Sequence, residues 1–302
     1  MTTLRTAFAL GLTLTGFALL GAAGRADETA DKLAKQRVAV KANLKAGKVA
    51  LNTAETADLI VSAPYPAERV AKVAAEVQKA YAAAAKTLKY EPKDPPLAGK
   101  LAVYVIADPK AYKIFLLQAM KRSPRGKEAV ESDLRSETPQ MVINAGADEK
   151  PTEAGVTAQA SRAVAAAILS VKAGTTTGDA GLPTWVEAGF GNAVTLRAEG
   201  NAAKLAAHTA KVKALASKSR GAALQLKAVY GDAPSADAEL VTTSFLEYLV
   251  FGPGAEKFPE LLTALKAGEG NEAPTIWTAF TALEWKVETV EAAWRKWVLT
   301  GK

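Results

Sequence analysis

The chain has 302 residues, of which 49% are hydrophobic, so it is large enough to bury a sizeable core. It contains no cysteine, which excludes disulfides, thiol nucleophiles, cysteine-ligated metals and a lipid-modified cysteine anchor. The formal net charge is +7, but the charges of both signs are mixed along the chain and no basic run carries interleaved aromatic residues, so we expect no nucleic-acid partner.

The N-terminus is typical of an exported protein. Met1–Arg5 carries one positive charge, and Ala7–Ala23 is an almost uninterrupted apolar run followed by small residues. This pattern predicts a signal peptide over residues 1–26, with cleavage after Ala26 or Ala23, and a periplasmic or extracellular mature chain. The apolar run is short and rich in Gly and Thr, so we expect no stable membrane span after cleavage. An uncleaved N-terminal anchor is the alternative, because it has the same pattern.

A lead-in and a small α/β lobe follow. Residues 27–57 contain the Ala, Lys and Glu-rich stretch Glu28–Lys45, which predicts a helical or disordered lead-in. Residues 58–150 alternate between strand and helix patterns. We expect strands at Asp58–Ala63, Lys100–Ala107 and Gln140–Ala145, and helices at Ala67–Leu88 and Pro109–Met120. The unbroken apolarity of Lys100–Ala107 indicates a strand covered on both faces, and Asp108 is expected to cap the helix after it.

The second half of the chain predicts a helical lobe over residues 151–302. Apolar residues recur there at helical spacing between Gly, Pro and Asp residues. We expect helices at Thr152–Val171, Pro183–Ala198, Ala202–Ser217, Ala222–Tyr230, Ser235–Phe251, Ala255–Ala267, Pro274–Leu283 and Val287–Leu299. An α/β lobe with a short sheet, followed by a mostly helical lobe, indicates the α+β fold class.

Few residues suggest catalysis. His208, the only imidazole, lies three residues after Leu205 and four before Val212 in a predicted helix, beside the buried face. A lone His in that position is typical of packing or hydrogen bonding. No GxSxG nucleophile elbow and no GxxxxGK[ST] phosphate loop is present. Gly189–Gly191 matches only part of a GxGxxG motif and lies inside a helical pattern, so the nucleotide interpretation is weak.

One segment is more informative. Leu182–Phe190, with the sequence LPTWVEAGF, resembles the LPxWLxEGLA signature of the gluzincin metallopeptidases, the peptidase MA-like group. In that family the Glu of the EG pair is the third zinc ligand, and an upstream HExxH helix supplies two His ligands and the general base. Other segments occur in the family's order: Val103–Val105 with Tyr112, Ser244–Val250, Phe258–Gly268 and Val287–Val298. The resemblance spans residues 55–300 and implies a zincin-like fold.

The chain departs from the family at the metal. The positions that correspond to the two His ligands, the general base and the third ligand are, in that order, Ser161, Ala165, Arg162 and Ala188. None of these side chains can replace its counterpart at a zinc ion. Glu187 is one residue from the ligand position, which turns a helical side chain by about 100°. The resemblance therefore implies a degenerate zinc site with no metal and no other cofactor.

The sequence thus predicts an exported, catalytically inactive gluzincin-like domain, a pseudopeptidase. It would bind a peptide or an envelope protein in a retained groove, along a sheet edge, with Trp185 and Glu187 as possible groove residues. Two alternatives stay open. One is a hydrolase with a site that does not use zinc, built from Glu187, Arg162 or His208. The other is a purely structural envelope protein, which would show a broad exposed apolar patch and no concave site.

Overall fold

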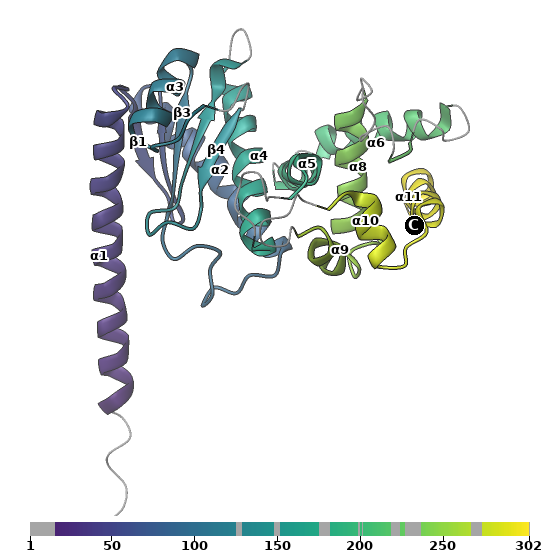
Figure 1. The fold of residues 1–302 in the computed structure, drawn as a ribbon, viewed down its shortest axis with the longest axis horizontal. Coiled ribbons are helices and arrows are strands. Elements are labelled where there is room, and N and C mark those ends of the chain that lie inside the picture. Colours follow the sequence, from purple (N-terminus) through teal and green to yellow (C-terminus); the bar gives the residue numbers. More distant parts are fainter. Residues whose placement is uncertain are drawn as a thin grey trace, which may run out of the picture.

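The computed structural model describes residues 16–124, 129–147, 152–174, 182–198, 200, 202–218, 224–226, 237–266 and 274–301, with side chains from residue 30 onward. Within these residues, a mixed sheet and its covering helices form one lobe, and further helices form a second lobe (Figure 1). The predicted α+β class, with a sheet lobe followed by a helical lobe, is confirmed.

A five-stranded sheet forms the centre of the first lobe. Its strands, in spatial order, are β1 (Asn52–Glu55), β2 (Leu59–Ala63), β3 (Leu101–Ile106), β5 (Gln140–Asn144) and β4 (Val130–Asp133). The three central strands run parallel and are the three that the sequence predicts, whereas each edge strand is antiparallel to its neighbour. The edge strands β1 and β4 were not predicted, because NTAE and VESD are short and contain no apolar run.

Helices cover both faces of the sheet. They are α1 (Gly16–Ala46), α2 (Ala67–Thr87), α3 (Pro109–Gln118) and α4 (Glu153–Ala173). Because side chains alternate along a strand, Val103 of β3 joins the core with α2 and α4, while Tyr104 packs with α1 and α3. Every residue of β3 is buried, as its apolarity predicts. Asp108 also caps α3 as expected, since its carboxylate accepts the backbone N–H of Lys110 at 2.8 Å.

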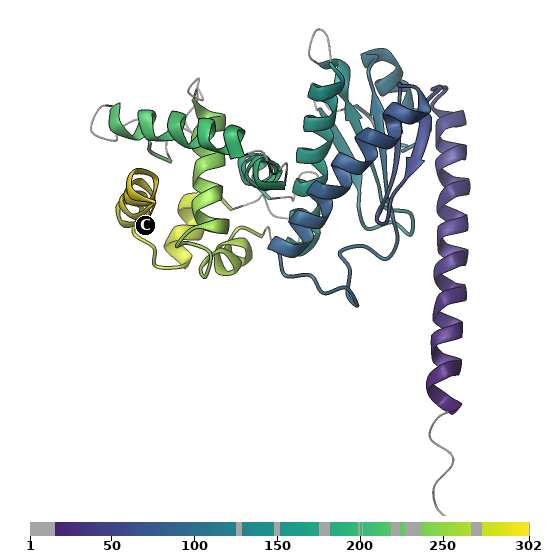
Figure 2. The same cartoon turned by 180° about the vertical axis from the view of Figure 1, so that it is seen from behind.

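The segment predicted as a lead-in belongs to the sheet lobe. Its helix is confirmed as part of α1, and residues 52–55 add strand β1. Val40 is buried against the sheet, and the side chain of Gln36 donates to the carbonyl of Lys100 at 2.9 Å and accepts from its N–H at 3.1 Å. The N-terminal half of α1 extends away from the lobe in both views (Figures 1 and 2). Residues 7–15 of the predicted signal-peptide core lie outside the described residues.

The second lobe contains α5 (Thr184–Ala198), α6 (Ala202–Ser217), α8 (Ala238–Phe251), α9 (Phe258–Ala264), α10 (Ile276–Ala282) and α11 (Val287–Thr300). Each of these helices, like α4, lies within or close to a predicted one. The helix predicted at Ala222–Tyr230 lies outside the described residues, apart from 224–226, which are not helical. α5 connects the lobes, because it packs against α2 and α4 on one side and α8 on the other (Figure 1).

The two lobes share one hydrophobic core, which runs from Val103 in the sheet through Phe190 of α5 to Trp294 of α11. α4 was assigned to the helical lobe by its sequence position, but it packs on α2 over the sheet as well as on α5. It is the one helix among the described residues that is long and apolar enough to span a membrane. Half of its most apolar stretch is buried inside the molecule, so its position in the core explains its apolarity.

Candidate functional site

Helices α4 and α5 carry the positions aligned with the zinc site. α5 packs closely against both α4 and α8, and two glycines make this possible. A Cβ at Gly191 would lie 2.5 Å from the carbonyl oxygen of Arg162 on α4. A Cβ at Gly189 would lie 3.0 Å from the carbonyl oxygen of Thr242 on α8. Gly189 and Gly191 therefore allow close helix packing on two sides of α5. α5 is held between α4 and α8 by contacts that larger residues would prevent.

The four positions aligned with zinc chemistry lie in different surroundings. Ser161 is buried and lines a cavity, and Arg162 lines a second cavity beside it. Ala165 is completely buried in the core, whereas Ala188 is exposed. Among the residues that the structure describes, no group of three or more His, Asp or Glu side chains could hold a metal ion.

Glu187, rather than Ala188, is the residue whose side chain reaches α4. Its Oε1 accepts a hydrogen bond from Ser170 Oγ at 2.5 Å. Burial raises the pKa of Glu187 above its ordinary value, and the bond from Ser170 opposes this rise. Trp185 is partly buried, with its ring centroid 6.3 Å from that of Phe245. Neither of these predicted groove residues lines any of the cavities discussed below.

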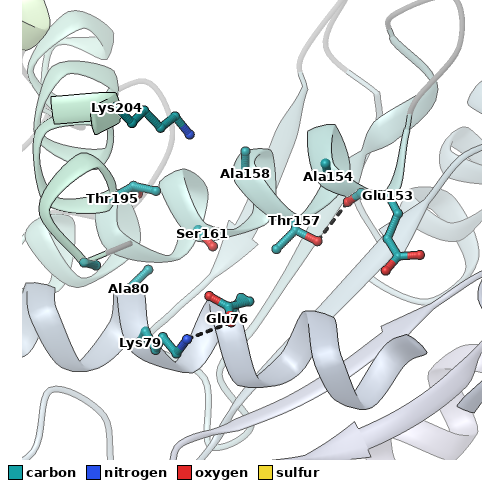
Figure 3. A pocket seen from close by; sticks show the side chains of 11 residues that line it. Glu76, Lys79, Ala80, Glu153, Ala154, Thr157, Ala158, Ser161, Thr195 and Lys204 are labelled. Atoms are coloured by element: carbon teal, nitrogen blue, oxygen red, sulfur yellow. Dashed lines mark hydrogen bonds and ion pairs between the residues drawn. The ribbon is translucent and has the colours of Figure 1, made fainter. Parts of the chain in front are cut away.

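Two adjoining cavities lie between helices where the lobes meet. The first, of about 330 Å³, is bounded by α2, α4, α5 and the start of α6 (Figure 3). The second, of about 490 Å³, lies between α4, α5, α6 and the start of α8. Both are lined by Ala158, Thr195 and Lys204, which therefore mark their junction. We refer to the two together as the interhelical cavity.

Small side chains leave the first cavity open, and hydroxyl groups make part of it polar. Ala154 and Ala158 on α4 present only methyl groups (Figure 3). Thr157 donates its hydroxyl to the carbonyl of Glu153 at 2.8 Å. The hydroxyl of Ser161, on the same helix, makes no hydrogen bond with another described residue. This hydroxyl is available to a bound molecule.

Two buried polar atoms in the lining of the second cavity have no hydrogen-bond partner among the described residues. They are Thr195 Oγ1 and His208 Nε2. Thr195 is only 5% exposed, so its hydroxyl is also shielded from solvent. Leaving such a group unpaired costs about 1–3 kcal/mol, and proteins accept that cost mainly where a water or ligand satisfies the atom.

His208 lies in a mixed electrostatic environment. Its Nε2 is 3.7 Å from Glu247 Oε2, and Arg197 donates to the other oxygen of Glu247 at 2.6 Å. Burial lowers the pKa of His208 below its ordinary value of 6.5, the charge of Glu247 opposes this, and the charge of Lys211 adds to the lowering. His208 is therefore neutral at pH 7.

The walls of the second cavity carry opposite charges. α6 presents the cationic Lys204 and Lys211, with the neutral His208 between them, and their spacing of four and three residues puts all three on one helix face. The start of α8 presents Asp237 and Glu239. A ligand in this cavity would therefore meet cations on one wall and carboxylates on the other.

The residues offered for a hydrolase without zinc do not form one site. Arg162 and His208 both line the second cavity, but Glu187 does not. The sequence could have indicated that Lys204, His208 and Lys211 share one face of α6, since they recur at helical spacing. Nothing in the sequence around Thr195 could have indicated its role, because its neighbours in the cavity come from four helices.

No protein-family model, curated protein or solved structure matches this chain. The gluzincin resemblance therefore rests on Leu182–Phe190 and on the order of the other segments along the chain. The chemistry of the interhelical cavity carries the functional interpretation.

Proposed function

We propose that this chain is an exported, catalytically inactive gluzincin-like protein that binds a peptide segment, free or part of an envelope protein, in the interhelical cavity. One observation carries the proposal. Ser161 and Arg162, the positions aligned with the first His ligand and the general base, line the two cavities, yet neither can ligate or activate a zinc-bound water. Two of the four positions aligned with the family's zinc chemistry thus border the interhelical cavity, whereas Ala165 lies in the core and Ala188 is exposed.

The lining suits a polypeptide backbone. Ser161 offers a hydroxyl without a partner among the described residues, and a hydroxyl can pair with either a backbone N–H or a carbonyl. Ala154 in the first cavity and Ala158 at the junction leave room for a main chain with small side chains. This proposal puts the peptide between helices, rather than along the sheet edge expected from the sequence.

The charged groups of the cavity support binding more than hydrolysis. Arg162 is paired with Glu239 at 3.7 Å, and Asn192 donates to the same carboxylate at 3.2 Å. Both of these side chains contact the carboxylate of Glu239, so it is already engaged within the protein. A hydrolase would need a base with a perturbed pKa close to its nucleophile.

Retention of peptides by the mature chain, residues 27–302, tests this function. A pool of random tetrapeptides is passed over the immobilised protein, with and without added zinc, and retained peptides are identified by mass spectrometry. We expect retention of intact peptides and its loss in Ala158→Phe, because the ring would fill the junction of the two cavities. Ala188→Phe, at an exposed position on α5 outside both cavities, is the matched control and should retain the pool.

Two results would overturn the proposal. Cleaved peptides in the presence of zinc would show that the chain is catalytic. Equal retention by the wild type and by a folded Ala158→Phe variant, as judged by its melting temperature, would show that the peptides bind elsewhere.

A further inference from the structure

We propose that the outer surface of helices α1 and α3 docks the protein on a membrane that contains anionic lipids. This surface, which we call the basic face, consists of exposed lysines near the end of α1 and of the outward-facing residues of α3 and the turn after it. Its members are Lys41, Lys45, Lys48, Lys110, Lys113, Ile114, Leu117 and Lys121. The inference does not depend on peptide binding in the interhelical cavity.

Two segments depart from the mixed charge pattern of the rest of the chain. Residues 32–54 and residues 109–127 each contain six Lys or Arg and no Asp or Glu. They are far apart in the sequence, but the fold brings their helices together, because α1 and α3 lie side by side over the same face of the sheet (Figure 1). Two stretches of positive charge therefore meet on one side of the molecule.

The contact between α1 and α3 fixes the basic face. Phe115 of α3 is buried against Tyr104 of the sheet, with the ring centroids 4.7 Å apart. Gly47, which follows α1, lies directly against the ring of Phe115, since a Cβ there would overlap it. Asn43 of α1 donates its side-chain N–H to the hydroxyl of Tyr104 at 3.2 Å. The end of α1 and the length of α3 are thus held together, and their exposed residues belong to one surface of the lobe.

The face of α3 that points away from the sheet combines cations with apolar side chains. Lys110, Lys113, Ile114 and Leu117 recur at helical spacing, and Lys121 follows the helix. Ile114 is 42% exposed and Leu117 is 46% exposed. Exposed aliphatic side chains flanked by lysines are typical of surfaces that enter the headgroup region of a bilayer.

The protein does not neutralise the lysines of the basic face. None of the six makes an ion pair or a side-chain hydrogen bond with another described residue. The neighbouring Arg37 and Arg122, by contrast, pair with Glu55 at 2.7 Å and with Glu131 at 3.3 Å. Six ammonium groups on one side of the lobe create a positive potential that anionic headgroups would neutralise.

An anionic bilayer matches this surface better than a nucleic acid does. Sites for nucleic acids place aromatic or Arg side chains among the lysines, which stack on bases or hold phosphates, and the basic face contains neither. Its apolar side chains would find no apolar partner on a phosphate backbone. At a bilayer the lysines meet the headgroup phosphates, while Ile114 and Leu117 reach the acyl chains.

Docking through the basic face would leave the interhelical cavity accessible. The cavity is bounded by α2 and α4, which pack on the opposite face of the sheet from α1 and α3. The two surfaces therefore lie on different sides of the sheet lobe.

Vesicle flotation of the predicted mature chain, residues 27–302, tests the inference. This chain lacks the apolar run of residues 7–23, which would bind lipid by itself. One set of vesicles contains phosphatidylglycerol and phosphatidylcholine in equal amounts, and the other contains phosphatidylcholine alone. We expect the wild type to bind the first set at least about tenfold more tightly at low salt, and high salt to reduce this preference.

A charge variant locates the contact on α3. The combined substitutions Lys110→Gln, Lys113→Gln and Lys121→Gln should weaken binding to the anionic vesicles about a hundredfold, because each lysine near such a surface contributes a factor of about five. The matched control has the same net charge, since it replaces three exposed lysines of α2 and α6, and it should bind like the wild type. Its substitutions are Lys72→Gln, Lys86→Gln and Lys213→Gln.

An apolar variant tests the second component of the surface. Ile114→Gln combined with Leu117→Gln should weaken binding to the anionic vesicles about tenfold, although the charge of the protein is unchanged. All of the replaced residues are exposed, so each variant should keep the melting temperature of the wild type.

Four results would overturn the inference. Equal binding of the wild type to both sets of vesicles would exclude recognition of anionic lipid. Equal weakening by the two triple lysine variants would show that net charge, rather than the basic face, determines binding. Unchanged binding of the apolar variant would show that the surface does not enter the bilayer. Binding of duplex DNA as tight as that of anionic vesicles would show that the surface accepts polyanions in general.

Discussion

Burial and a hydrogen bond act in opposite directions on the pKa of Glu187: burial raises it, and the bond from Ser170 lowers it. This residue lies one position before Ala188, which the resemblance to gluzincins aligns with a zinc ligand. Its side chain reaches Ser170 on α4, while Ala188 is exposed to solvent. One residue along a helix thus separates a partly buried, hydrogen-bonded acid from a solvent-facing methyl group.

We expect Glu187→Gln to raise the free energy of unfolding at pH 7. The pKa of Glu187 in the folded chain is raised above its ordinary value of 4.5, so its charged form is less favourable in the folded chain than in the unfolded one. This destabilisation is present above the folded-state pKa and disappears as the pH falls through it. The gain should therefore appear in thermal unfolding at pH 7 and vanish below a pH of about 4.5.

Glu256→Gln is the control for this substitution, because Glu256 is exposed and a change there should leave stability unaltered at both pH values. A Glu187→Gln variant that unfolds at a lower temperature than the wild type at pH 7 would contradict the prediction. It would mean that the bond from Ser170 outweighs the cost of burying the charge.

At the scale of elements, α5 determines how the two lobes meet. Phe190 lies in the shared core, and the glycines on either side of it bring α8 and α4 close. These residues therefore act as packing elements, whatever the ancestry of the segment. The interhelical cavity depends on this arrangement, since Asn192 and Thr195 reach it from the same helix.

Gly191→Ala should lower the free energy of unfolding by about 1–3 kcal/mol. The added Cβ would lie 2.5 Å from the carbonyl oxygen of Arg162, and a backbone atom can move only if α5 shifts away from α4. Urea denaturation measures the change. Gly155→Ala is the control, because Gly155 is exposed in the first turn of α4 and an alanine there should be neutral or stabilise the helix by up to ~1 kcal/mol.

A Gly191→Ala variant as stable as the wild type would show that the contact between α4 and α5 can relax. The wall of the cavity formed by α4 and α5 would then be less rigid than their close contact indicates.

At the scale of the whole molecule, α1 has two halves with different surroundings. The half nearer the sheet packs against α3 and the strands through Val40 and Gln36. The half nearer the N-terminus extends from the lobe (Figure 2) and contains the predicted cleavage sites. Cleavage there would leave in place the part of α1 that covers the sheet. The fold is therefore compatible with the predicted export.

A chain that begins at residue 27 should have the melting temperature of the full chain. One that begins at residue 47 should lose about 3 kcal/mol or more, because the side chains of α1 no longer bury the face of the sheet that carries Tyr104. Calorimetry of the two truncated chains tests this difference. Equal stability of the two would mean that α1 contributes nothing to the fold, contrary to its contacts with Lys100 and the sheet.

The sequence by itself determined most of the elements. Helices and central strands bury a face or both faces, so their apolar residues recur at a fixed period, as in α2 and β3. The edge strands β1 and β4 have no such pattern, because an edge strand is specified by its partner's backbone as much as by its own side chains. The absence of HExxH was also a property of the sequence alone.

The tertiary structure alone decided the site. Thr195, Lys204 and Glu239 lie on three different helices, and no periodicity along the chain relates them. They line one cavity because two glycines let α5 approach its neighbours, which leaves alanine-lined space beside the contact. The orientation of Glu187 toward Ser170 likewise depends on how α5 sits on α4, since side-chain direction on a helix has meaning only against the surface it faces.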